Sequence, residues 1–214
     1  MSPAKIDHVL GGYTGGLGTD IARIPQEGPW RALFGSGIMR DGEAVRSTNE
    51  FYEKSKEVDQ EYTSAMDIAK QKGAKQIADT NLSAEHYRYR RLQAVMADIR
   101  AVYKGETDTE KLNEKVRYIN GLARAALGKE PLVHYPNMFD TRISLPRSLV
   151  PIRRDFLASL ARTVDSSTVE SEKASFASRR EASRRRDEAL ALLRTVNVSL
   201  VRARRYLKEK EALK

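Results

Sequence analysis

The chain of 214 residues has no cysteine, so disulfides and thiolate chemistry are excluded. It has no apolar run long enough to cross a bilayer, and its first residues lack the basic start and apolar stretch of a signal peptide. Aromatic residues make up only 7% of the chain, whereas charged residues make up 31%. We therefore expect a soluble, intracellularly made protein with a core of moderate size.

Basic residues are in excess toward the C-terminus. The net charge is +9, and residues 129–214 hold 19 basic but only 11 acidic residues, against 19 and 18 in residues 1–128. Such an asymmetry favours a basic arm that binds a polyanion. The alternative is a solvated helix whose charges serve solubility.

The motifs of common catalytic and cofactor sites are also missing. The three histidines, His8, His86 and His134, have no ligand-type spacing, and Gly-x-Ser-x-Gly is absent. Residues 15–18 lack the preceding strand and the following Lys-Ser/Thr of a phosphate-binding loop. We expect no catalytic residue, no metal and no cofactor, and hence a structural or docking protein rather than an enzyme.

A glycine-rich apolar segment occupies residues 2–24. Ser2 and Pro3 are typical of a helix start, and apolar residues follow at helical spacing. Two overlapping Gly-x-x-x-Gly pairs interrupt the helix, and each glycine costs about 1 kcal/mol relative to alanine. The segment therefore either packs closely against another backbone or breaks into two pieces. The residues expected to form this helix-packing and oligomer contact are Gly11, Gly12, Tyr13, Gly15, Gly16 and Leu17.

Residues 26–46 are expected to be irregular, because glycine and proline recur throughout them. They contain an apolar knot, which we define as residues 30–34, with Trp30, Leu33 and Phe34 as its large side chains. An exposed knot of this kind is sticky. We expect it to be pinned to the helices of the chain or to a partner.

Three amphipathic helices are predicted between residues 47 and 128, each with a capping residue at its start and a glycine at its end. The expected caps are Ser47 with Glu50, Ser83, and Thr107 with Glu110, and the expected stops are Gly73, Gly105 and Gly128. Because the linkers between the three helices are short, an antiparallel helical bundle is predicted.

Residues 129–148 are expected to be a linker, because Pro131, Pro136 and Pro146 are incompatible with a continuous helix. A short helix is predicted over residues 149–164. The chain as a whole is therefore assigned to the all-α class. Its expected parts are a packing segment (1–46), a bundle (47–128), a linker (129–148) and a basic helical arm (149–214).

One long basic helix is predicted from about residue 168 to near the C-terminus, with Ser167 and Glu170 as its capping box. Its first half, through Arg186, has few large apolar residues and is expected to be a solvated or polyanion-facing rod. Its second half has apolar residues to pack on the rest of the chain.

Arginine dominates this predicted helix, and guanidinium groups bind phosphate through two parallel hydrogen bonds. Residues 173–205 hold 10 basic and 3 acidic residues, which predicts DNA or RNA binding without sequence preference. The alternative is that these arginines pair with acidic groups on a neighbouring subunit. The candidate nucleic-acid contacts are Arg179, Arg180, Arg184, Arg185, Arg186, Arg194, Arg202, Arg204 and Arg205.

Several sequence words resemble a known family. These are SPAKIDH at residues 2–8, GYTGGLG at 12–18, RST at 46–48, NEFYE at 49–53 and NGLARAA at 120–126. Together they are similar to the large polyvalent protein-associated domain 38, over roughly residues 1–128. Residues after 128 have no such resemblance, and the basic arm departs from the family's pattern.

The resemblance implies a structural role in a tailed phage. Such domains occur in very large phage and mobile-element proteins, some of which resemble internal virion proteins that leave the capsid with the genome. The expected protein is made in the host cytoplasm, resides in the virion, forms a homo-oligomer, and contacts the portal, the tail or non-specific DNA. No catalytic residue accompanies the resemblance.

Three alternatives remain open at this point. The chain could be a non-virion adaptor that tethers the enzymes of a polyvalent protein. It could be an enzyme, such as a cell-wall hydrolase fragment, with an acidic group of raised pKa in a cleft. It could also enter a membrane during delivery, because glycine pairs serve helix packing in lipid, although charged residues interrupt the N-terminal stripe.

Overall fold

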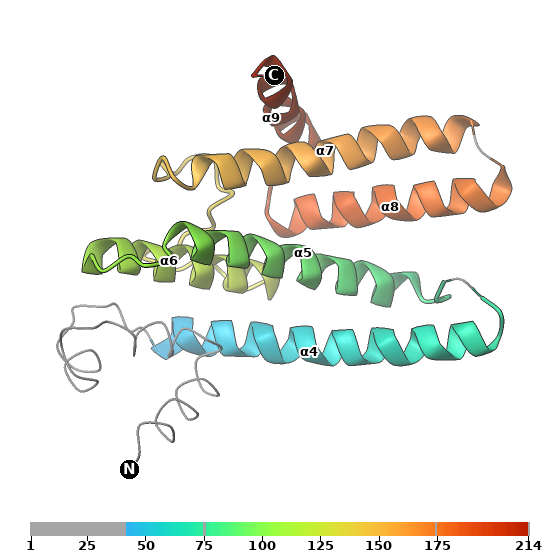
Figure 1. Ribbon diagram of the computed structural model, residues 1–214, viewed down its shortest axis with the longest axis horizontal. Coiled ribbons are helices and arrows are strands. Elements are labelled where there is room, and N and C mark those ends of the chain that lie inside the picture. The colour runs from blue at the N-terminus through green and yellow to red at the C-terminus, as the bar shows by residue number, and fades with distance from the viewer. Residues whose placement is uncertain (1–41, 75, 174, 214) are drawn as a thin grey trace, which may run out of the picture.

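The computed structural model describes residues 42–74, 76–173 and 175–213, which form six α-helices and no strand (Figure 1). This arrangement confirms the all-α prediction. The helices are α4 (Gly42–Gln71), α5 (Thr80–Val102), α6 (Thr109–Ala126), α7 (Val150–Lys173), α8 (Phe176–Thr195) and α9 (Leu200–Ala212).

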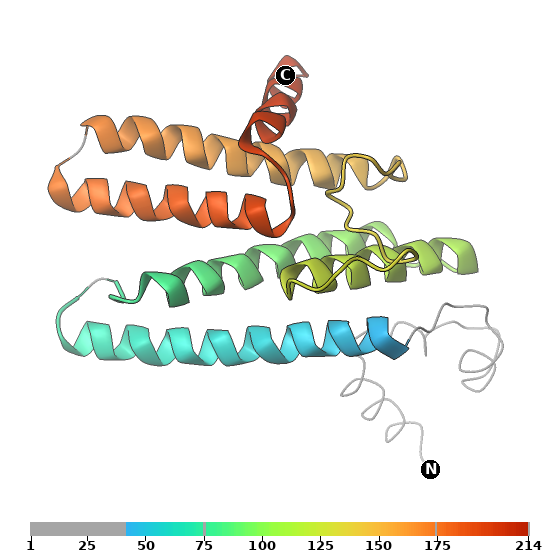
Figure 2. The same cartoon turned by 180° about the vertical axis from the view of Figure 1, so that it is seen from behind.

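The described helices are arranged in two packed groups. Helices α4, α5 and α6 contact one another, and α7 and α8 form an antiparallel hairpin that packs on α5 (Figures 1 and 2). Helix α9 packs on α7, on the side of the molecule opposite α4. The basic C-terminal part of the chain is therefore folded back on the bundle.

The glycine stops predicted for the first three helices are confirmed. Gly73, Gly105 and Gly128 follow the ends of α4, α5 and α6 and have φ angles of +72°, +79° and +69°. This left-handed conformation ends a helix and strains any residue with a Cβ, which is why glycine marks these positions in the sequence.

The predicted cap at Ser47 is wrong, because α4 begins five residues earlier, at Gly42. Ser47 lies inside the helix and is fully buried against α6, where its Oγ accepts a hydrogen bond of 3.1 Å from Nη1 of Arg124. The neighbouring Thr48 hydroxyl donates to Oδ1 of Asn120. These small hydroxyl groups therefore serve the contact between two helices rather than a helix start.

The cap of α5 is Asp79, not Ser83. The Asp79 carboxylate accepts from the backbone N–H groups of Asn81 and Leu82, and Ser83 is buried within the first turns of the helix. Helix α6 is capped by Asp108, one residue after the predicted Thr107. A hydroxyl followed three residues later by a carboxylate thus marked the right region of α6 but not the capping residue.

The predicted long basic helix is divided into three. The predicted short helix over 149–164 continues as α7 to Lys173, so Ser167 is a buried residue inside α7 and not a cap. Ser175, in an extended conformation, begins α8, and Asn197 with a φ of +58° separates α8 from α9. The sequence is helical almost throughout, but the chain turns back twice because the inner faces of α8 and α9 both pack on α7.

The first half of α8 is also more buried than predicted. Ala182 is fully buried, and Ala189, Leu192 and Leu193 continue the same inner face. Small alanine side chains let α8 pack close to α7 without large apolar residues, so the solvated rod expected through Arg186 is instead half of a helical hairpin.

The linker of residues 129–148 belongs to the core. It has no helix, as predicted, and contains one isolated antiparallel bridge between Leu132 and Tyr135. Met138 and Phe139 are fully buried and join one apolar cluster that extends over all six described helices.

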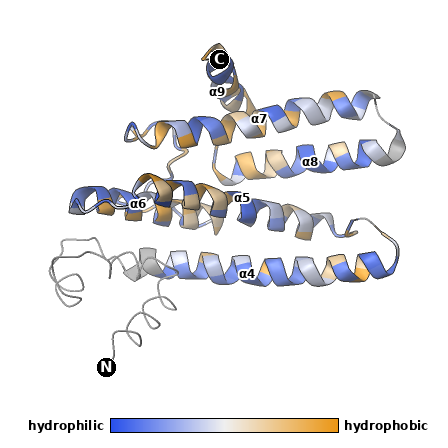
Figure 3. Ribbon diagram, in the orientation of Figure 1, coloured by the Kyte–Doolittle hydropathy of each residue, from blue (hydrophilic) through white to orange (hydrophobic). Residues whose placement is uncertain are grey.

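Apolar bands lie where α5 and α6 face each other, whereas α4 is mostly hydrophilic (Figure 3).

Gly121 in α6 allows the linker to approach. A Cβ at this position would overlap the backbone carbonyl of Pro136, so only glycine fits here. Asn137, which follows Pro136 in the linker, donates from Nδ2 to the carbonyl oxygen of Val196 at 3.0 Å. The linker is thereby held between α6 and the end of α8.

Candidate nucleic-acid interface

The nine candidate arginines fall into two groups in the structure. Four of them make ion pairs within the chain, and five have guanidinium groups without an ion pair or hydrogen bond to any described residue. The paired group is Arg184, Arg185, Arg186 and Arg204. The unpaired group is Arg179, Arg180, Arg194, Arg202 and Arg205.

Arg184 is the most deeply integrated of the paired group. Its Nη1 donates to Oγ of Ser83 at 3.0 Å, and its Nη2 donates to Oε1 of Glu181 at 2.9 Å. Oγ of Ser83 in turn donates to Oε1 of Glu188 at 2.9 Å. This polar cluster joins α8 to α5, so Arg184 holds two helices together and does not face a partner.

Glu188 sits at the centre of that cluster with only 8% of its side chain exposed. Burial raises its pKa above the ordinary carboxyl value, because the charged form loses hydration. The hydrogen bond from Ser83 and the charge of Arg184 act in the opposite direction without cancelling the effect of burial. The cluster therefore holds a carboxylate at a cost in stability.

Arg185 and Arg204 connect helices at the surface. Nη2 of Arg185 lies 2.9 Å from Oε2 of Glu170 in α7, and Nη2 of Arg204 lies 2.6 Å from Oδ1 of Asp165 in α7. Arg186 pairs only with its neighbour Asp187, at 3.4 Å. Arg185 and Arg204 thus attach α8 and α9 to α7. Their acidic partners lie in the same chain, whereas the alternative prediction had placed such partners on a neighbouring subunit.

The unpaired arginines of α8 share its outer face. Arg180 and Arg194 are 14 residues apart, close to four turns of 3.6 residues, and Arg179 lies next to Arg180. All three are exposed, opposite the buried alanines and leucines of the same helix. Arg179 and Arg194 are 15 residues apart, which corresponds to about 22 Å along the helix axis. This length is close to that of about six base pairs of a DNA duplex.

Arg202 and Arg205 extend the unpaired group onto α9, where both are exposed. Near Arg202 lies Asp140, a carboxylate already occupied by Arg142 through three side-chain hydrogen bonds. Hydrogen bonds from Arg142 hold the pKa of Asp140 below its ordinary value, and the charge of Arg202 lowers it further. The local surface at the α8–α9 corner is therefore rich in guanidinium groups.

Sequence reasoning missed an interaction of His86. Its Nε2 lies 3.0 Å from Oδ1 of Asp59, and its ring stacks on Tyr62 with centroids 3.9 Å apart. The stack joins α5 to α4, and no local sequence signal marks it, because Asp59 and His86 are 27 residues apart. His134 is exposed in the linker, and His8 lies outside the described residues. Among the described residues, no three His, Asp or Glu groups could together hold a metal ion.

The expected helix-packing contact is not tested, because Gly11, Gly12, Tyr13, Gly15, Gly16 and Leu17 all lie outside the described residues. Within the described part of the chain, no helix is long and apolar enough to span a membrane.

Comparisons with known proteins leave the family open. No family model, curated protein or solved structure matches this chain. The resemblance to the large polyvalent protein-associated domain 38 therefore stays a prediction.

Proposed function

We propose that this chain is a structural component of a phage virion, an internal protein that oligomerises and contacts viral DNA or the portal–tail apparatus during genome delivery. It acts without catalysis, through helices that touch other macromolecules. Two independent considerations support the proposal: the family words in residues 1–128 and the disposition of the arginines in α8 and α9.

The observation that carries the DNA contact is the outward row of arginines. Arg179, Arg180 and Arg194 share one exposed face of α8, and no acidic side chain among the described residues neutralises them. A fixed row of guanidinium groups binds a phosphate backbone by releasing its condensed counterions, without reading the base sequence. Because Arg184, Arg185, Arg186 and Arg204 are already used within the chain, the proposed interface is the five unpaired arginines only.

DNA binding at several salt concentrations tests this part of the proposal. Changing all five unpaired arginines to glutamine should weaken binding, and the slope of log K against log salt should become less negative by up to about 4. The control changes Arg185, Arg186 and Arg204 to glutamine, which removes three paired charges from the same helices. A five-arginine variant that binds as tightly as the unmodified chain, with the same salt slope, would rule out the interface.

The location in the virion is tested separately. Mass spectrometry of purified particles should detect the chain at a fixed ratio to the portal protein. Its absence from particles, while it copurifies with enzymes of the same genome, would instead favour the non-virion adaptor. The oligomer is tested by light scattering of the intact chain and of a Gly12→Leu, Gly16→Leu variant, in which the bulkier side chains should reduce the oligomer mass.

A further inference from the structure

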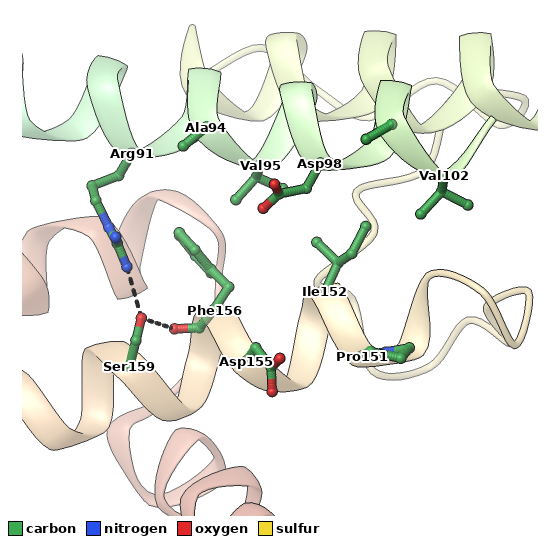
Figure 4. A pocket seen from close by; sticks show the side chains of 11 residues that line it. Arg91, Ala94, Val95, Asp98, Val102, Pro151, Ile152, Asp155, Phe156 and Ser159 are labelled. Carbon is green, nitrogen blue, oxygen red and sulfur yellow. Dashed lines mark hydrogen bonds between the residues drawn. The ribbon is translucent and has the colours of Figure 1, made fainter. Parts of the chain in front are cut away.

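Four arginines in the described part of the chain lie over aromatic rings, and three of them also donate to an acceptor within the chain. The acceptors are Glu85 for Arg88, Ser159 for Arg91 (Figure 4) and Tyr52 for Arg100. The fourth arginine, Arg153 at the start of α7, makes no hydrogen bond or ion pair with any described residue. Its guanidinium is therefore a cation whose N–H groups still need an acceptor.

Arg153 is also partly withdrawn from water. Its Nε and Nη1 atoms are buried without an acceptor among the described residues, whereas its Nη2 atom is not buried. The guanidinium carbon lies 6.0 Å from the ring centroid of Tyr206 in α9, at the outer limit of a cation–π contact. Such a weak ring contact offsets little of the cost of withdrawing a cation from water, and a ligand displaces it easily. An anion on the accessible side of this guanidinium would supply the missing acceptor.

The position of Arg153 in its helix adds to the unfavourable electrostatics. Arg153 lies in the first turn of α7, which contains no acidic residue, and Arg154 follows it directly. The partial positive charge at a helix N-terminus favours acidic side chains there and disfavours basic ones. A bound anion would offset both the charge of the guanidinium and that of the helix end.

A second unpaired cation lies close to Tyr206 on α9. Arg202 is exposed and precedes Tyr206 by four residues, so the two residues share one face of this helix. Tyr206 therefore has Arg153 of α7 against its ring and Arg202 one helical turn away. The packing of α9 on α7 thus brings two guanidinium groups without carboxylate partners near each other.

Two carboxylates of the same region are already paired. Asp155 of α7 lines the groove between α5 and α7 (Figure 4), and its Oδ1 lies 3.0 Å from Nζ of Lys210 in α9. Asp140, the carboxylate near Arg202, is held by Arg142 at 2.8 Å. Neither carboxylate is left to neutralise the two unpaired guanidinium groups, so the local charge is available to an external anion.

We propose that Arg153 and Arg202 form a phosphate-binding site at the junction of α7 and α9. Arg153 donates through its accessible Nη2 to a phosphate oxygen, and Arg202 adds a second guanidinium to the same anion. Arginine suits this ligand because its charge is permanent and its N–H groups match phosphate oxygens. A phosphate of a DNA backbone and a free phosphate ion carry the same chemistry, and experiment separates the two sources.

The site deepens the proposed DNA contact, and it rests on that contact where the phosphate belongs to DNA. Arg202 is one of the five unpaired arginines of the proposed interface, and Arg153 extends this interface from α8 and α9 onto α7. Arg153 is not one of the nine candidate arginines, because it precedes the arginine-rich stretch of residues 173–205. A free phosphate ion would occupy the same site without any DNA contact.

Thermal unfolding in phosphate tests the site without DNA, because a ligand that binds only the folded chain raises the Tm. Sodium phosphate should raise the Tm of the unmodified chain more than sodium chloride of the same ionic strength. Arg153→Met should lose most of this difference, and Arg202→Met, at an exposed position that protects the fold from the substitution, should lose part of it. Arg88→Met is the matched control: it removes another arginine that lies over a tyrosine ring and should keep the difference.

Binding of a short DNA duplex gives the second test. Arg153→Met should weaken binding about tenfold, because one hydrogen-bonded phosphate contact is lost. The slope of log K against log salt should become less negative by about 0.9. Arg153→Lys should recover the slope but not the full affinity, because it keeps the charge and loses the planar fork. Arg88→Met should change neither quantity, and far-UV circular dichroism in chloride checks that each variant remains helical.

The two measurements distinguish the sources of the phosphate. Loss of the Tm difference alone in Arg153→Met supports a site for free phosphate. Loss of DNA affinity, with or without loss of the Tm difference, supports a site for a backbone phosphate. If Arg153→Met behaves like Arg88→Met in both measurements, the site is excluded, whereas the proposed DNA contact is still decided by the variant that lacks all five unpaired arginines.

Discussion

Arginine is used differently in helix α5 of the bundle and in helices α8 and α9 of the arm. In the bundle, three arginines of α5 lie over aromatic rings, with the guanidinium carbon 5.1–5.6 Å from the ring centroid. The pairs are Arg88 over Tyr89, Arg91 over Phe156 and Arg100 over Tyr52. In the arm, α8 and α9 instead divide their arginines between carboxylates inside the chain and open solvent.

The difference shows that a count of basic residues overstates the charge offered to a partner. A guanidinium that stacks on an aromatic ring or pairs with a carboxylate is already bound, and a phosphate must displace that contact. Among the arginines of α8 and α9, only the unpaired ones can bind a phosphate without first breaking a hydrogen bond or ion pair to a described residue. The proposed DNA interface is therefore smaller than the basic stretch of the sequence.

The largest expected effect tests whether bundle and arm share one core. Leu122→Ala in α6 and Leu160→Ala in α7 each remove a fully buried side chain and should lower the free energy of unfolding by about 3 kcal/mol. Because the apolar cluster is continuous, urea unfolding followed by circular dichroism should remain a single transition in both variants. Val201→Ala, at a position 66% exposed, is the control and should change little. Two separate transitions would show that bundle and arm unfold independently.

A smaller effect separates the paired from the unpaired arginines. Arg184→Leu leaves Glu188 buried without its guanidinium partner and should lower the free energy of unfolding by about 2 kcal/mol. Arg180→Leu removes the same charge from the outer face of α8 and should change it by less than about 0.5 kcal/mol. Thermal unfolding measures both, and equal losses would contradict the division into two groups.

Glu188→Gln tests the cost of the buried carboxylate. Burial raises the pKa of Glu188 in the folded state, so folding favours its protonated form, and stability is lost as the pH rises through that pKa. The glutamine variant keeps the hydrogen bond to Ser83 without the charge and should be more stable by about 1 kcal/mol at pH 7. The gain should vanish at pH values below the ordinary carboxyl pKa. Urea unfolding across this pH range measures it, and a gain independent of pH would exclude the charge as its cause.

The smallest effect concerns the surface ion pairs of the arm. Arg185→Gln and Arg204→Gln should each lower the free energy of unfolding by less than about 1 kcal/mol, because both pairs are partly exposed. High salt should reduce the difference from the unmodified chain. Losses above 2 kcal/mol that persist in high salt would mean that these pairs are essential to the packing of the arm.

Local signals predicted much of the fold. The glycine stops and the apolar stripes are properties of a few neighbouring residues, so α5, α6 and the end of α4 were found from the sequence. The division of the basic arm was not found, because the residues near 174 and 197 do not exclude a helix. The chain turns there because α8 and α9 bury their inner faces on α7.

The candidate site was predicted only as a set of nine positions. Which arginines are paired depends on partners distant in the sequence, such as Ser83 for Arg184 and Asp165 for Arg204. The hydroxyl of Ser83 looked like a helix cap because the same atom can accept from a backbone N–H or from a guanidinium. Only the packing of α8 on α5 decides between these uses.

Asn137 gives the linker a mechanical role. Its side-chain oxygen accepts from the backbone N–H of Phe139, while its nitrogen donates to the carbonyl oxygen of Val196, directly after α8. The turn that precedes α9 is therefore held by the linker, which also packs against Gly121 of α6. Together with the packing of α9 on α7, this amide holds the corner from which the exposed Arg202 and Arg205 project.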